Sequence, residues 1–165
     1  ASSLPAALGC VIAALGTGLT LFLQSPPMEG GIRTAWFLLG ALSAVGLPVV
    51  AWSRIKGKLP VFGCHAVFTL FFGAHLISHY QFWSSNPQGI DYFHELFALL
   101  CLMLFGYQQA AFDVGDRKVM VCAGFLSTFF CFAALWGSSY STLLLAGGLW
   151  AATNTFTYRQ PAEKE

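Results

Sequence analysis

The side chains best suited to chemistry lie close together in one part of the chain. All four histidines fall within thirty residues, and an acidic pair lies in the same region. His75 and His79 are four residues apart, which places them on one face of a helix. Asp91 and Glu95 repeat that spacing, so a chain reversal between the two pairs would bring their faces together. The residues of the predicted polar pocket are His75, His79, Asp91, His94 and Glu95.

Gln109 extends the acidic face of this pocket. At 100° per residue, Asp91, Glu95, Leu102, Gln109 and Asp113 fall within a helical stripe about 40° wide. An ionisable side chain costs at least ~2.5 kcal/mol in the middle of a bilayer unless it faces protein or water. We therefore expect this stripe to face a bundle interior or a hydrated pathway, and we count Gln109 among the pocket candidates.

Imidazole and carboxylate groups in one pocket would suit a cation. His75, His79 and Glu95 form a candidate metal-ligand set, because both group types bind zinc and other transition ions. The HExxH order of zincin-like hydrolases is absent, since no second histidine follows the His94-Glu95 pair. A bis-histidine haem would need His75 or His79 to face His94 from another helix. These patterns alone assign no cofactor.

A simpler interpretation requires no ligand. Asp91 could cap a helix whose dipole Glu95 would oppose. His79 and His94 would then contact interfacial water, and His65 would bond a backbone carbonyl or a lipid headgroup. His75, about twelve residues from the turn, is the residue that this interpretation does not explain.

The elements that must position these residues are apolar and long. Charged residues are 9% of the chain and hydrophobic residues 56%, whereas soluble domains have about 25% charged residues. Stretches near 20 residues can cross a bilayer as helices. We predict an all-α polytopic membrane helix bundle, formed as a single domain over residues 1–165, with five spans if the last two merge. Its six predicted spans are 4–23, 34–52, 61–83, 92–112, 119–137 and 140–158.

The basic residues predict an orientation. Seven of the eight Lys and Arg residues fall in alternate gaps, and Arg33 is the exception. The positive-inside rule then places the N- and C-termini in the cytoplasm. Aromatic residues would mark the interfaces, with Trp36, Trp83, Trp136 and Tyr140 on the outer side. The net charge of +1 gives no support to nucleic-acid binding.

The second half of the chain resembles uncharacterised multi-span membrane proteins of Firmicutes-type bacteria. The resemblance rests on a pattern like W..NP...DY..EL.AL, which runs from Trp83 to Leu99 and is followed by Ala110 to Asp113. It implies a location in a bacterial plasma membrane as a multi-pass protein. It transfers no catalytic residue and no activity.

Several functions are compatible with these patterns. We expect a small solute-binding or transport subunit in the lipid bilayer, acting with a membrane partner subunit or as a homo-oligomer. The first alternative is a metal-dependent or haem-containing membrane enzyme that uses the same histidines and carboxylates. The second alternative is a non-catalytic accessory protein whose polar hairpin is a docking surface.

Overall fold

The computed structural model describes residues 4–24, 30–58, 62–84, 92–111 and 117–157. These residues form six α-helices, and no β-strand occurs among them. Every helix coincides with one predicted span to within three residues at either end, so the all-α prediction is confirmed. The helices are α1 (Leu4–Leu23), α2 (Gly31–Ile55), α3 (Phe62–Ser84), α4 (Phe93–Ala110), α5 (Arg117–Ala134) and α6 (Ser141–Phe156).

A turn separates α5 from α6, so the five-helix alternative is wrong. It contains Gly137, Ser138 and Ser139, which are residues that favour turns over helix. The Ser138 hydroxyl accepts a hydrogen bond from the backbone N–H of Tyr140 at 2.9 Å. This turn also places Tyr140 at the start of α6, where it reaches the candidate site.

Helix α2 is the longest of the six, at 25 residues. It ends where Gly57 adopts a φ of 65°, a left-handed conformation that glycine tolerates best. The N–H of Gly57 donates to the Arg54 carbonyl, and the N–H of Lys58 donates to the Ser53 carbonyl. These bonds close the last helical turn and hold Arg54 at the end of α2.

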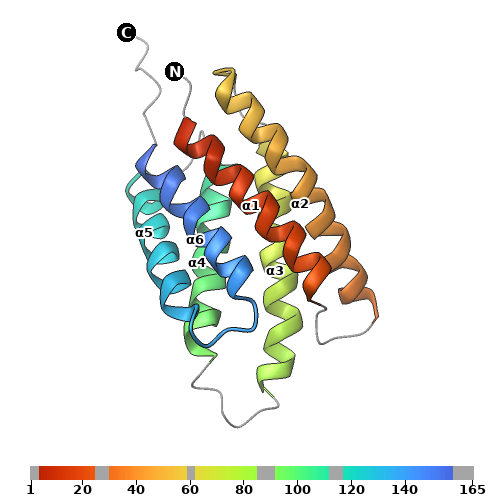
Figure 1. The fold of residues 1–165 in the computed structure, drawn as a ribbon. Coiled ribbons are helices and arrows are strands. Elements are labelled where there is room, and N and C mark those ends of the chain that lie inside the picture. Colours follow the sequence, from red (N-terminus) through yellow and green to blue (C-terminus); the bar gives the residue numbers. More distant parts are fainter. Residues whose placement is uncertain (1–3, 25–29, 59–61, 85–91, 112–116, 158–165) are drawn as a thin grey trace.

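The six helices form a closed ring. Each helix packs against its neighbours in sequence, and α6 closes the ring by packing against α1. Successive helices run in opposite directions, so α1 begins and α6 ends at the same end of the bundle (Figure 1). We call this the termini end, and we call the opposite end, which carries the α5–α6 turn, the turn end.

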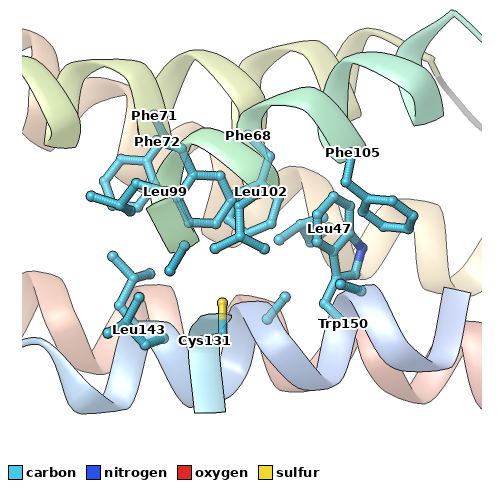
Figure 2. Close-up of a cluster of buried hydrophobic side chains, with 14 of the residues drawn as sticks. Leu47, Phe68, Phe71, Phe72, Leu99, Leu102, Phe105, Cys131, Leu143 and Trp150 are labelled. Carbon is cyan, nitrogen blue, oxygen red and sulfur yellow. The ribbon is translucent and has the colours of Figure 1, made fainter. Parts of the chain in front are cut away.

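Large apolar side chains fill the middle of the ring. Phe68, Phe71 and Phe72 of α3 pack against residues from the other side of the bundle, and Trp150 of α6 meets the Phe68 ring at 5.0 Å (Figure 2). Leu102 and Leu143 are also fully buried there. This layer, the central apolar layer, lies between two groups of buried polar residues, one toward each end of the bundle.

Small residues bring the helices close together. A Cβ atom on Gly16 of α1 would collide with the Ala146 methyl group of α6. A Cβ atom on Gly106 of α4 would likewise collide with the Thr69 hydroxyl of α3. Glycine therefore permits close approach of the helices at these two interfaces.

Two helices are long and apolar enough to cross a membrane by length and hydropathy, namely α1 and α2. In the part of the chain that the structure describes, the other four helices do not meet that test. Three histidines on α3, and Glu95 with two glutamines on α4, reduce the hydropathy of those helices.

Candidate functional site

The buried polar group at the turn end includes His75, which is fully buried. We call this group and its immediate neighbours the turn-end site. The partner of His75 is Trp36 of α2, whose indole Nε1–H donates to His75 Nδ1 at 3.0 Å. An indole N–H can only donate, so His75 Nδ1 must be the acceptor and the ring proton must reside on Nε2. The Trp36 contact therefore determines the tautomer of His75.

His79 lies one helical turn further along α3, with its ring centroid 4.2 Å from that of His75. Its Nδ1 is 2.9 Å from the His75 carbonyl oxygen and 3.0 Å from the Ser78 hydroxyl. Because a carbonyl only accepts, Nδ1 carries the proton and donates. Neutral His79 therefore offers Nε2 as an acceptor, whereas His75 offers Nε2–H as a donor.

Tyr140 connects these histidines to Glu95. Its ring packs edge-on against His75 and His79, with centroids at 4.6 Å and 4.5 Å. The neighbouring Ser138 hydroxyl accepts from the Tyr140 N–H and hydrogen-bonds the Glu95 carboxylate. Tyr140 is also within electrostatic range of Glu95. The α5–α6 turn thus joins α3 to α4 at the turn end.

Two polar atoms of this group have no hydrogen-bond partner. His75 Nε2 and Glu95 Oε1 are both buried and unpaired. An unsatisfied buried polar group costs ~1–3 kcal/mol, and more when it is charged. The site therefore combines an unfilled donor with an unfilled acceptor, surrounded by the aromatic rings of Trp36, Trp83 and Tyr140.

The predicted pocket residues have different positions in the fold. His75, His79 and Glu95 are brought together around Tyr140, whereas His94 is exposed on the first turn of α4. Asp91 lies outside the described residues.

Gln109 does not belong to this group. It lies 14 residues along α4 from Glu95, about 21 Å at 1.5 Å per residue, and it is buried at the termini end. The predicted stripe does face the bundle interior, since Glu95, Leu102 and Gln109 are all buried. The stripe contributes to two separate polar groups, whereas a single pocket was predicted.

The metal and haem alternatives each require a particular set of ligands. Within the described residues, no three His, Cys, Asp or Glu side chains gather in a group that could hold a metal ion. The haem alternative needs His94 beside a buried histidine, and His94 is exposed. The set of His75, His79 and Glu95 as metal ligands stays a prediction.

Sequence reasoning missed Trp36, Tyr140 and Ser138 as members of the site. Trp36, Trp83 and Tyr140 were expected at the membrane interface, yet Trp36 is fully buried and the other two are each 8% exposed. Only Trp136 of that group is exposed, at 98%. A signal did exist in α2, where the buried residues recur with helical period. They are Trp36, Gly40, Ser43, Leu47 and Val50.

Comparisons of the chain with protein-family models, with curated proteins and with solved structures found no match.

Proposed function

We propose that this chain is a multi-pass membrane protein with six spans. The outer face of every helix carries exposed apolar side chains, while histidine, glutamate and glutamine side chains are buried inside. Such an arrangement suits a lipid surround, because water would leave a large apolar surface uncovered. One exposed residue from each helix illustrates the pattern, with exposures of 42% to 71%: Leu15, Val45, Leu70, Leu104, Phe129 and Leu145.

The proposed orientation has the termini end in the cytoplasm. Arg54, Lys56, Lys58, Arg117 and Lys118 lie at or near that end, against Arg33 at the other. The positive-inside rule then directs both termini inward and the turn end outward. The resemblance to Firmicutes-type membrane proteins supports a bacterial plasma membrane as the location.

Within this membrane protein, we propose a site for a small polar solute at the turn end. The observation that supports it is the pair of unsatisfied buried atoms, His75 Nε2 and Glu95 Oε1, whose residues both neighbour Tyr140. A solute with one acceptor and one donor or ammonium group would satisfy both. Binding would occur from the outer side, and transport would require a membrane partner subunit or a second copy of the chain.

A binding screen tests the site. Purified protein in detergent is heated with a panel of primary amines, amino acids and polyols, and the melting temperature is recorded. We expect at least one compound to raise the melting temperature of the wild type but not of His75→Ala or Glu95→Gln. His94→Ala is the matched control, because that histidine is exposed. An equal shift in all four proteins, or none in any, would overturn the solute site.

Fusions and cofactor analysis test the remaining parts of the proposal. A fluorescent protein after Glu165 is expected to fluoresce, whereas alkaline phosphatase at the same point is expected to be inactive. The opposite pattern contradicts cytoplasmic termini. Stoichiometric metal or a Soret band in the wild type, lost in both His75→Ala and His79→Ala, would replace solute binding with the enzyme alternative.

A further inference from the structure

A second group of buried polar side chains lies at the termini end, beyond the central apolar layer. Five helices contribute to it, and its members surround Arg54 at the end of α2. They are Cys10, Arg54, His65, Gln109, Trp150 and Asn154. We propose that this group binds a small oxyanion, either a carboxylate or a phosphate.

The positive charge is the first argument. Arg54 Nη2 donates to Gln109 Oε1 at 3.2 Å, and the Gln109 amide nitrogen then donates to Met120 Sδ at 3.6 Å. Arg54 Nε is buried and has no partner. Within the described residues, where Glu95 at the turn end is the one acidic side chain, no carboxylate contacts this guanidinium. The Arg54 side chain is partly buried, and a charge removed from water in this way is costly unless a counter-charge accompanies it.

The second argument is the number of unsatisfied atoms around that charge. His65 is fully buried, and neither of its ring nitrogens has a partner. The bond from His65 to a backbone carbonyl, one of the two expected for it, is absent from the structure. Trp150 Nε1 and Asn154 Oδ1 are also buried without partners. Four side chains from three helices, α2, α3 and α6, therefore present unused hydrogen-bonding atoms at one end of the bundle.

The side chains that carry these atoms are neighbours at the termini end. Cys10 of α1 lies beside the Trp150 indole and the Asn154 amide and within electrostatic range of Arg54. His65 is likewise within electrostatic range of Arg54, and its ring centroid is 6.0 Å from that of Trp150. The Asn154 amide nitrogen donates to the Trp150 carbonyl at 2.8 Å, which leaves its oxygen as an acceptor.

The donor and acceptor atoms of the termini-end group indicate which ligand it would bind. Arg54 Nε–H and Trp150 Nε1–H are obligatory donors, and neutral His65 adds a third N–H. Three donors beside one positive charge match the oxygens of a carboxylate or phosphate, for which guanidinium is the preferred partner. Asn154 Oδ1 and the second His65 nitrogen can accept from a hydroxyl or amine of the same ligand. This ligand is separate from the solute proposed at the turn end.

The experiment uses the full chain, purified in detergent without phosphate. Melting temperatures are measured with inorganic phosphate, sulfate or acetate, and co-purified lipids are identified by native mass spectrometry. We expect either a free anion to raise the melting temperature or an anionic phospholipid to remain bound. In both cases Arg54→Gln should abolish the effect. Arg33→Gln, an exposed arginine at the other end, is the matched control and should retain it.

A second variant keeps the test decisive if Arg54→Gln does not fold. Trp150→Phe retains an aromatic ring in the core and removes one donor, so it should weaken binding about tenfold. If the ligand is a free anion, phosphate, sulfate or acetate should raise the melting temperature and no anionic lipid should be bound. If the ligand is a lipid headgroup, an anionic lipid should be bound and the free anions should leave the melting temperature unchanged. No anion effect and no bound anionic lipid in the wild type would overturn the proposal, as would equal binding in the wild type and Trp150→Phe.

Discussion

Trp36 and His75 form the interhelical hydrogen bond that determines the tautomer of the buried histidine at the turn end. The indole N–H donates to His75 Nδ1 at 3.0 Å, and both side chains are fully buried. His75 Nε2–H is therefore a donor available to a ligand, and its availability depends on a residue of another helix.

Trp36→Phe tests this dependence. The ring is largely retained and the donor is lost, so His75 Nδ1 is left without a partner. We expect the free energy of unfolding to fall by about 1–3 kcal/mol. Nitrogen NMR of the labelled imidazole should show loss of the pure Nε2–H tautomer. Trp136→Phe is the control, because Trp136 is 98% exposed. An unchanged His75 spectrum in Trp36→Phe would contradict the assignment.

Glu95→Gln should separate stability from binding. The amide oxygen can still accept from Ser138, while the charge of a buried carboxylate with one unpaired oxygen is removed. We expect the free energy of unfolding without solute to stay equal or to rise by up to about 2 kcal/mol. Denaturant titration in detergent measures it. A loss larger than 2 kcal/mol would show that the carboxylate has a stabilising partner.

Gly16→Ala should loosen the contact between α1 and α6. The new methyl group collides with the Ala146 methyl group, so one helix must shift. Overpacking of this kind costs about 1–3 kcal/mol, which unfolding in detergent would detect. Gly18→Ala adds the same methyl group on the same helix where no atom lies within 4 Å. It should be neutral or stabilising by up to about 1 kcal/mol. Equal effects of the two substitutions would contradict the proposed packing.

Cysteine alkylation should follow burial. Cys122 is exposed on α5, whereas Cys10 and Cys131 are buried inside the bundle. We expect N-ethylmaleimide to modify Cys122 first in detergent, and Cys10 and Cys131 only after unfolding, because reaction requires an accessible thiolate. Mass spectrometry of digested protein at successive times gives the order. Early modification of Cys10 would show that the termini-end group is open to solvent.

The helices could be predicted closely because each is encoded by a continuous apolar stretch of about 20 residues. The direction of the α4 stripe could be predicted for the same local reason. Its division into two groups could not, because Glu95 and Gln109 share a face but lie at opposite ends of α4.

The site residues that the sequence did not predict are brought together by contacts between helices that are distant in sequence. Trp36 meets His75 across 39 positions of the chain, and Tyr140 reaches the histidines because the ring closes α6 against α1. An interfacial position was a reasonable prediction for both aromatic residues. Their burial depends on the order of the helices around the ring, which no local pattern encodes.

The central apolar layer also has an electrical consequence under the proposed location in a membrane. Phe68, Phe71, Phe72 and Leu102 are all at most 1% exposed, and they occupy the axis of the ring between the two polar groups. An ion entering this layer would lose its hydration and gain no polar partner, at a cost of many kcal/mol. Water could therefore reach a polar group at either end without creating a conductive path, and the membrane would keep its voltage.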